Sequence, residues 1–349
     1  MAMADVTIFG AGIAGMTLAW TCLQRGAKVQ IWDKRAPGAG ASGGLVGALA
    51  PHVPEQWIPK KAFQLESLLM AEPFWTEIGG AAGKDPGYSR SGRLQAIADG
   101  AGLLLARSRH ENAKVLWEGK ARWDVVQAAQ VGSWAPRSES GWLVHDTLTA
   151  RLNPRLACAA LVAAIESEGG QILTGNTPPD LEGKIVYATG YEGLLEFSEA
   201  MGREVGNGVK GQGALLKYDA GNAPQLFAEG VHVVPHSNGT VAVGSTSERY
   251  YDTPDVVDEQ LDAVIEKAMQ VVPVLQGAEV VDRWAGVRPR AKTRAPMIGP
   301  VPDTKDVFIS NGGFKIGFGM APKVATIMAD LILDGIDTIP DDFRVEASL

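Results

Sequence analysis

The chain has 349 residues, enough for one large domain or two ordinary ones, and 46% of them are hydrophobic. Its net charge of −8 argues against a general nucleic-acid binder, because neutralising phosphates requires clustered lysine and arginine. We expect no membrane span, since no run of 18 apolar residues is free of charge, and no signal peptide at the N-terminus.

The two cysteines, Cys22 and Cys158, each lie among helix-forming residues without a cysteine or histidine at metal-ligand spacing. We interpret both as small buried hydrophobic residues rather than a redox pair or metal ligands. The sequence therefore predicts no metal site, and the pattern fits a reducing cytoplasm.

The first 33 residues predict a strand, a helix and a second strand. Asp5–Phe9 is a short β-branched apolar run, Met16–Gly26 has apolar residues at helical spacing, and Lys28–Asp33 alternates and ends in an acid. Gly26 is a plausible residue to end the helix. This βαβ unit places a glycine-rich turn directly after the first strand.

The glycines of that turn have the spacing of a dinucleotide site. Gly10 permits the tight turn, Gly12 lets a pyrophosphate approach the backbone, and Gly15 lets the helix pack against the strand. The helix N-terminus offers N–H groups to phosphates, and Asp33 can bind a ribose hydroxyl. The alternative is a glycine-rich turn in another α/β protein, and NAD and FAD are both open at this point. The predicted binding residues here are Gly10, Gly12, Ile13, Ala14, Gly15, Asp33 and Lys34.

A second glycine-rich stretch, Arg35–His52, follows the second strand and is nearly uncharged. An NAD-binding domain normally continues here into another helix. A long loop of small residues instead indicates backbone lying flat against a broad, extended cofactor. The stretch therefore favours FAD.

Six ordered motifs extend over nearly the whole chain. They are Ile8–Lys34, Gly40–Pro51, Gly183–Gly193, Val231–Glu248, Arg283–Pro300 and Phe308–Leu333. Together they resemble the D-amino-acid oxidase/glycine oxidase superfamily of FAD-dependent amine oxidoreductases. Local patterns within these motifs support the resemblance. Asn238-Gly239 predicts a hairpin, and Met320–Leu333 predicts an amphipathic helix with Pro322 near its first turn.

The resemblance implies an α/β fold in which a Rossmann-like FAD-binding domain is interleaved with a β-rich, α+β substrate-binding domain. The first domain is expected from residues 1–80, 145–210 and 285–349, and the second from 81–144 and 211–284. Within them, Asn153-Pro154 should begin a helix and Asp258–Val272 should form another.

The resemblance also implies further FAD contacts along the chain. No cysteine lies in a stretch that resembles the flavin-linking positions of covalent relatives, so we expect noncovalent FAD. The N-terminus of the last helix, with Gly317, Gly319 and Met320, should stabilise negative charge on the flavin. The remaining predicted cofactor contacts are Ala41, Ser42, Gly47, Ala48, Leu49, Ala188, Thr189, Gly190, Gly286, Arg288, Gly313, Phe314, Lys315, Ile316 and Gly317.

Four residues are candidates for the substrate site. Arg288 matches the arginine that grips a substrate carboxylate in the family, and its guanidinium suits a bidentate contact. Lys315 lies where relatives carry an arginine, whereas the histidine of their motif is replaced by Gly313. His232 lies where glycine oxidase offers a tyrosine hydroxyl, and His52 follows the flavin loop. Each has an ordinary structural alternative as an ion-pairing, solvent-facing or packing residue.

Other residues near these motifs have a weaker case. Tyr250, Tyr251 and Trp57 are candidates for a substrate entrance, or else packing residues. Three basic residues near Arg288 could steer anions or form a solvated face. These are Arg290, Lys292 and Arg294.

The sequence therefore predicts FAD-dependent oxidation of a small amino acid or secondary amine. Hydride transfer from the α carbon to flavin N5 would leave an imine that hydrolyses. Glycine, sarcosine-like amines, D-amino acids and proline-like imino acids are all open, as are the electron acceptor and the oligomeric state. Alternatives are the oxidoreductase half of a tRNA wobble-uridine modification enzyme, which Gly40–Pro51 also resembles, and a non-catalytic flavoprotein or redox sensor. An NAD-dependent dehydrogenase is disfavoured.

Overall fold

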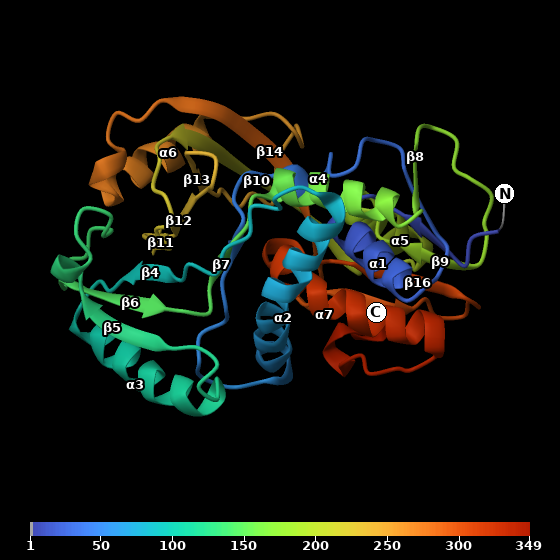
Figure 1. Ribbon diagram of the computed structural model, residues 1–349, viewed down its shortest axis with the longest axis horizontal. Coiled ribbons are helices and arrows are strands. Elements are labelled where there is room, and N and C mark those ends of the chain that lie inside the picture. The colour runs from blue at the N-terminus through green and yellow to red at the C-terminus, as the bar shows by residue number, and fades with distance from the viewer. Residues whose placement is uncertain (1–2) are drawn as a thin grey trace.

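The structure is a computed structural model that describes residues 3–349, and it is built around two large sheets. Figure 1 shows the sheets side by side, with helices against both and both chain ends in one half of the molecule. The expected α/β fold with a second, β-rich part is confirmed.

The first sheet has six strands, and its central members are the predicted βαβ unit. The strands β1, β2, β8, β9 and β16 pair in parallel, whereas β15 pairs antiparallel at one edge. In order across the sheet they are β15 (Met297–Pro300), β16 (Val307–Asn311), β9 (Lys184–Tyr187), β1 (Val6–Phe9), β2 (Val29–Asp33) and β8 (Gln171–Thr174).

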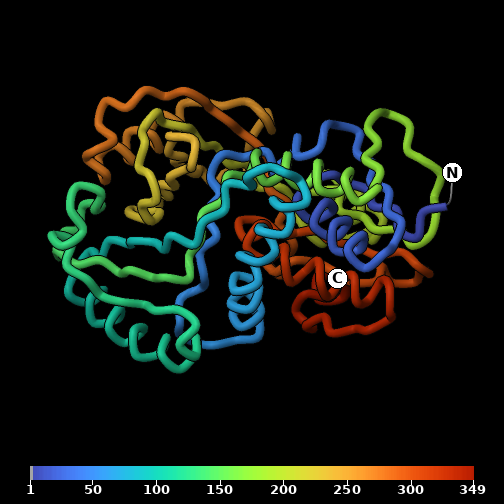
Figure 2. Tube along the Cα trace, viewed as in Figure 1, coloured from blue at the N-terminus to red at the C-terminus, as the bar shows by residue number. Residues whose placement is uncertain are grey.

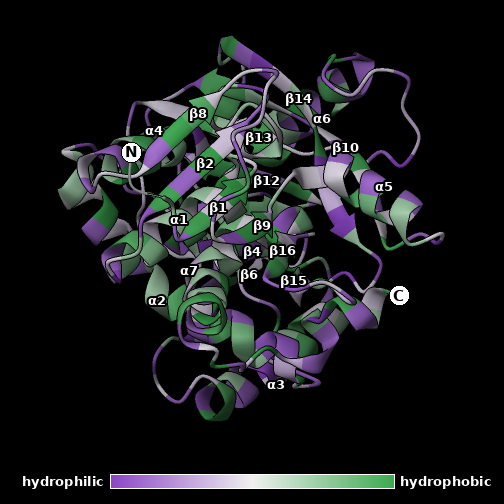
Figure 3. Ribbon diagram, turned by 90° about the vertical axis from the view of Figure 1, so that its right-hand side faces the viewer, coloured by the Kyte–Doolittle hydropathy of each residue, from purple (hydrophilic) through white to green (hydrophobic). Residues whose placement is uncertain are grey.

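Five helices accompany this sheet, and four of them share one apolar core with it. Helix α1 packs against α7, and α2 packs against both α4 and α7. Figure 3 shows hydrophobic residues concentrated around α1, α7 and β1, whereas α3 carries many hydrophilic residues. The helices are α1 (Ile13–Gln24), α2 (Pro59–Ala82), α4 (Pro154–Ser167), α5 (Gly190–Ala200) and α7 (Gly317–Ala329).

The second sheet has eight strands and a separate apolar core beneath α6. Its pairs are antiparallel except for β4 with β11. In order they are β14 (Val280–Ala291), β10 (Gly206–Lys217), β13 (Thr240–Gly244), β12 (Val231–Pro235), β11 (Gln225–Ala228), β4 (Arg93–Ala96), β6 (Trp142–Asp146) and β5 (Trp123–Gln127). Helices α6 (Glu259–Val271) and α3 (Gly100–Leu116) flank it, and β3 (Ala48–Leu49) pairs with β7 (Ala150–Arg151).

The chain passes between the two halves repeatedly, as Figure 2 shows. All six strands of the first sheet come from the segments predicted for the FAD-binding domain. Strands β10 and β14 extend across the predicted boundaries at residues 210 and 285 and lie entirely in the second sheet. The residue ranges of the two domains stay a prediction.

Several local predictions are confirmed. Asn153 accepts hydrogen bonds from the Arg155 and Leu156 amides and begins α4, and Asp258 caps α6. Asn238-Gly239 forms the turn between β12 and β13. Both cysteines are buried and free.

One prediction about the last helix was wrong. Helix α7 begins at Gly317, so Pro322 lies inside it rather than in its first turn. Glycines that look like loop residues in the sequence continue the helix here, because they pack against other helices. The helical stretch Phe314–Asp334 is long and apolar enough to cross a membrane, but 56% of its apolar window is buried in the protein, as in a core helix.

Candidate active site

The glycine turn after β1 allows the first sheet and α1 to approach closely. A Cβ atom on Gly10 would lie 2.3 Å from the Ala188 carbonyl oxygen, and the backbone φ of +108° is one that glycine favours. A Cβ on Gly15 would lie 2.0 Å from the Gly10 carbonyl oxygen. Neither glycine lines the cavity, so both shape the turn by allowing close packing.

A cavity of about 350 Å³ begins at this turn and extends along the carboxyl ends of the first sheet toward the second. This edge of an open α/β sheet is where such folds bind ligands. The predicted cofactor residues that line it are Gly12, Ile13, Ala14, Asp33, Ala41, Ser42, Gly47, Ala48, Leu49, Ala188, Thr189, Gly190, Gly286, Arg288, Gly313, Phe314, Lys315 and Gly317.

Two other predicted cofactor residues lie outside this cavity. Lys34 forms an ion pair with Glu192 at 2.6 Å, and Ile316 lines only a neighbouring smaller cavity. Lys34 is half exposed, and its partner Glu192 lines the cavity although Lys34 does not.

The end of the cavity at α1 has the groups that a dinucleotide requires. The N-cap residue of α1, Gly12, has no side chain to cap the helix, and the Ile13 amide donates instead to Ser42 Oγ at 2.9 Å. The carboxylate of Asp33 is held in place, because it accepts hydrogen bonds from the amides of Ala11 and Arg35, each at 2.9 Å. A pyrophosphate suits the helix N-terminus, and a ribose hydroxyl suits the fixed carboxylate.

A second helix N-terminus meets the other end of the cavity. Helix α7 also lacks a side-chain cap, and Gly317, Phe318, Gly319 and Met320 line the cavity. The positive end of its dipole is therefore directed at a site where a reduced flavin would carry negative charge. With the glycine-lined middle of the cavity, these groups fit an extended FAD.

Arg288 lies on β14 with its guanidinium partly buried beside the cavity. Nη2 donates to Ser245 Oγ at 2.7 Å, and both terminal nitrogens contact the Thr246 carbonyl oxygen at 3.3 Å. Within residues 3–349 it forms no ion pair, and burial lowers the pKa of Arg288 to about 10. Because its partners are all neutral, the positive charge of this guanidinium remains available to an anion.

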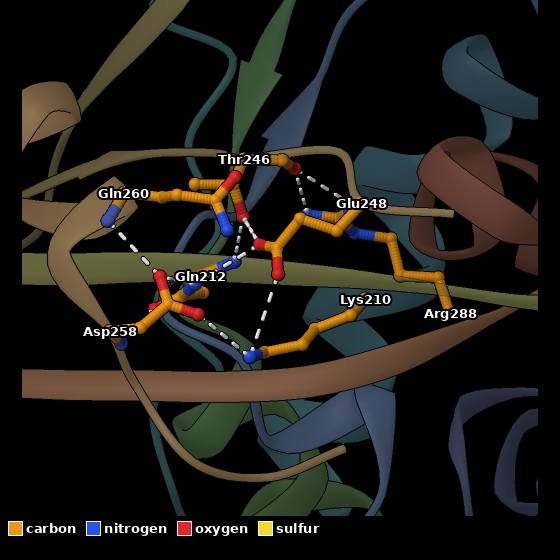
Figure 4. A network of polar contacts seen from close by, with 7 residues as sticks. All are labelled: Lys210, Gln212, Thr246, Glu248, Asp258, Gln260 and Arg288. Atoms are coloured by element: carbon orange, nitrogen blue, oxygen red, sulfur yellow. Dashed lines mark hydrogen bonds and ion pairs between the residues drawn. The ribbon is translucent and has the colours of Figure 1, made fainter. Parts of the chain in front are cut away.

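A buried polar network supports the turn that holds Arg288 (Figure 4). Glu248 accepts hydrogen bonds from Thr246 Oγ1 and from Gln212 Nε2, the latter at 3.0 Å. Its carboxylate also pairs with Lys210 at 3.5 Å, and Lys210 contacts Asp258 at 3.2 Å. The network fixes residues 245–248 and hence the carbonyl group that contacts the guanidinium.

Lys315 and His232 line both the large cavity and the smaller one, which has a volume of about 200 Å³. Burial and the neighbouring Arg288 lower the pKa of Lys315. Burial, followed by the charges of Arg93, Lys315 and Arg288, lowers the pKa of His232 to about 3. His232 is therefore neutral near pH 7, and its Nδ1 has no hydrogen-bond partner in the described chain.

His52 lines neither cavity. It contacts Gln64 through its backbone amide and its Nδ1 atom, and Gln64 lines the smaller cavity. Burial lowers the pKa of His52. The structure therefore places His52 behind Gln64.

The weaker candidates lie outside both cavities. Tyr250 is 94% exposed, and Trp57 packs against the main core. Tyr251 approaches Gly208. The guanidinium of Arg290 lies 5.9 Å from the ring centroid of Phe314, which lines the large cavity, whereas Arg290 itself does not. Lys292 contacts the Leu349 carbonyl oxygen at 3.3 Å, and the Arg294 carbonyl accepts from Lys60.

Sequence reasoning missed several residues that line the cavities. The ring of Trp284 lies over Gly286 and Gly44. The sequence could have indicated this contact, because Trp284 stands two positions before Gly286 and therefore on the same face of the strand. Arg93 had no local signal, because an arginine in a short strand resembles an edge residue. Gln64, Gln212 and Phe227 are among the other lining residues that sequence reasoning missed.

Comparison with known proteins agrees with this arrangement. Glycine oxidase from Geobacillus kaustophilus (strain HTA426) is 24% identical over 94% of this chain and 92% of its own, and the enzyme from Pseudomonas putida (strain KT2440) is 25% identical over 97% and 96%. The crystal structure of the Geobacillus kaustophilus protein has a TM-score of 0.85 and 19% identity over 98% of each chain. Iminodiacetate oxidase from Chelativorans sp. BNC1 has a TM-score of 0.82 and 22% identity, covering 97% of this chain and 98% of its own.

The two-sheet fold and its cavity define a flavin-binding oxidoreductase. The family model described as DAO, FAD dependent oxidoreductase, matches residues 5–331, and the chain belongs to this family.

Proposed function

We propose that the protein oxidises the C–N bond of a small amino acid or secondary amine. The chemistry that bound FAD supplies is acceptance of a hydride from the substrate α carbon at N5, which leaves an imine that water hydrolyses. The single observation that supports a carboxylate-bearing substrate is the partly buried guanidinium of Arg288, which borders the cavity and has no ion pair within residues 3–349. Glycine oxidases among the relatives support the same reaction class.

The chain's own residues would orient this substrate rather than exchange protons with it. Arg288 would hold the carboxylate, and the fixed carbonyl of Thr246 would keep the guanidinium in place. His232 is neutral at pH 7 and forms part of the wall, so it adds no charge beside the substrate amine, which must lose its proton to solvent before hydride transfer. The uncapped N-terminus of α7 would stabilise negative charge on the reduced flavin.

Anaerobic mixing with an amine and amino-acid panel tests the proposal. We expect the flavin absorbance of the protein to fall with at least one carboxylate-bearing amine. Arg288→Met should lower kcat/KM for that substrate by about 10- to 100-fold, since a charged hydrogen bond contributes about 1.5–3 kcal/mol. Arg283→Met is the matched control on the same strand, because Arg283 pairs with Asp262 and lines neither cavity.

Other outcomes would overturn parts of this proposal. Bound FAD that no amine bleaches would favour a non-catalytic flavoprotein. Unchanged turnover in Arg288→Met would remove the carboxylate assignment.

We propose that FAD is held noncovalently and that the protein acts in the cytoplasm. Neither Cys22 nor Cys158 lines the cavity, and burial raises the pKa of each thiol to about 12, so neither presents a reactive thiolate. Acid precipitation should release the yellow cofactor into the supernatant. Colour retained in the pellet would contradict this.

A further inference from the structure

The smaller cavity adjoins the large one through the side chains of Lys315 and His232, which line both. Its other polar side chains are Arg93 and Gln64, and no aspartate or glutamate lines it. Phe227 closes one wall, with its ring centroid 4.7 Å from that of His232. The cavity is therefore a small space lined by two cationic side chains, a histidine and an amide.

Arg93 is only partly satisfied by the protein. It lies on β4 and is 6% exposed, and its Nε donates to Asp146 Oδ2 at 3.0 Å. Asp146 is fully buried and also accepts a hydrogen bond from the Thr149 amide. The terminal nitrogens of Arg93 make no hydrogen bond within residues 3–349, although the residue borders the cavity. Because only Nε is used by the protein, the two terminal nitrogens of Arg93 are free to donate hydrogen bonds to another acceptor.

The charges around His232 do not balance. Arg93, Lys315 and Arg288 all act on its ring, and only Arg93 has a carboxylate partner. Lys315 forms no ion pair in the described part of the chain, and its ammonium group lies 5.6 Å from the centroid of Phe314. One substrate carboxylate at Arg288 would leave the Lys315 charge unmatched. Lys315 and Arg93 line the same small cavity, and two like charges near one another repel, so a second anion there would stabilise the site.

We propose that the substrate is a small amine with two acidic groups, of which one binds Arg288 and the other binds Arg93 and Lys315 in the smaller cavity. The inference rests on the proposed function, because it assumes that the α carbon is oxidised beside Arg288. Gln64 donates to the Ala50 carbonyl through Nε2, which fixes the amide at the rim of the cavity. The competing arrangement is one carboxylate shared between Arg288 and Lys315.

Matched substrate pairs distinguish these two arrangements. Iminodiacetate is compared with its monoamide, and both enantiomers of aspartate are compared with those of asparagine, because each pair differs in charge but hardly in size. We expect kcat/KM for at least one diacid to exceed that of its amide by about 10-fold or more. Equal values in every pair would overturn the inference while leaving amine oxidation intact.

Variants assign the preference to Arg93. Arg93→Met combined with Asp146→Asn removes both charges of the buried pair, and we expect the diacid-to-amide ratio to fall toward 1. Arg122→Met combined with Asp124→Asn is the matched control, because that pair has the same Nε–carboxylate distance of 3.0 Å but lies exposed and outside both cavities. A ratio that persists in the Arg93 variant would exclude Arg93 as the second anion contact.

A binding measurement keeps the inference testable without turnover. Iminodiacetate should raise the unfolding temperature of the FAD-bound protein more than its monoamide does, and Lys315→Met should reduce that difference. If the Arg93 variant does not fold, Lys315→Met alone still tests the site. No amine-dependent bleaching together with a diacid-specific shift would reject the proposed function and keep the second anion site. No shift and no diacid preference would reject the site.

Discussion

The guanidinium of Arg288 occupies space that is left open because residue 211 is a glycine. Gly211 lies on the neighbouring strand β10, and a Cβ atom there would lie 1.8 Å from Nη2 of Arg288. The family motif around Arg288 predicted a carboxylate clamp, but nothing in the sequence around Gly211 indicated that it makes room for it. Contacts between strands depend on register, which local sequence does not specify.

Gly211→Ala should displace the Arg288 guanidinium while the protein still folds and binds FAD. We expect KM for a carboxylate-bearing substrate to rise about 10-fold or more, because a charged hydrogen bond is lost or misdirected. Steady-state kinetics and the visible flavin spectrum measure the two effects. Gly80→Ala is the control, since its Cβ would meet nothing within 4 Å. Equal kinetics for both variants would contradict the steric argument.

His232 was a candidate substrate contact with a structural alternative, and it lines both cavities without titrating near neutrality. Its folded-state pKa of about 3 lies below the ordinary 6.5. Between pH 6.5 and about pH 3, His232 is protonated in the unfolded chain but not in the folded chain. The free energy of unfolding therefore falls as the pH falls through this range.

His232→Asn should reduce this acid sensitivity. A single histidine with these pKa values lowers the free energy of unfolding by up to about 2 kcal/mol between pH 7 and pH 5. Denaturant unfolding of the FAD-bound variant at both pH values should show a loss smaller by that amount. His236, whose pKa burial lowers to about 4, remains in both proteins and provides the internal comparison. An identical pH dependence would show that His232 is protonated more easily than its burial implies.

Among the elements, the turn at 245–248 was the least predictable. Sequence reasoning located the β12–β13 hairpin from Asn238-Gly239, but the buried network beyond it joins Lys210, Glu248 and Asp258 from separate segments. Such long-range charge pairing leaves no local pattern. The elements predicted correctly from the sequence had caps, glycine turns or regular apolar spacing. The start of α7 was placed too late, because Gly317 and Gly319 in its first turn are typical of a loop.

Glu248→Gln should weaken this turn. The substitution leaves Lys210, only 3% exposed, with one carboxylate partner that is itself partly exposed. We expect a loss of about 1–3 kcal/mol in the free energy of unfolding, together with a higher KM for carboxylate substrates. Glu279→Gln removes an exposed pair with Lys217 on the same strand and should change stability by less than about 0.5 kcal/mol. Similar losses in both variants would show that the network does not support the turn.

At the scale of the whole molecule, the cavity joins segments that are far apart in sequence. Its lining comes from the first glycine turn, the loop after β2, strand β14 and the start of α7. The βαβ motif and the second glycine loop predicted the cofactor, whereas the lining residues of β14 and of the start of α7 were expected from the family resemblance. The second cavity was not predicted, because it forms only where β4, β12 and α7 meet.

A cofactor that contacts both sheets binds only the folded chain. It should therefore raise the free energy of unfolding of the whole protein. Free FAD at 100 times its dissociation constant contributes about 2.7 kcal/mol, which corresponds to an increase of roughly 5 °C in unfolding temperature. Thermal unfolding of the FAD-depleted protein, with and without added FAD, measures this shift.

Two comparisons make that shift specific to the cavity. NAD⁺ should produce little change, because the loop after β2 and the α7 N-terminus together suit the longer, flavin-bearing cofactor. Gly12→Leu should abolish the response to FAD, since a side chain added at Gly12 enters the space that lies against the N-terminus of α1. The variant can fold, because Gly12 has an ordinary extended backbone and its Cβ would meet only Ser42 Oγ, at 3.2 Å. A normal FAD shift in Gly12→Leu would place the pyrophosphate elsewhere, and the assignment of the glycine turn would then be wrong.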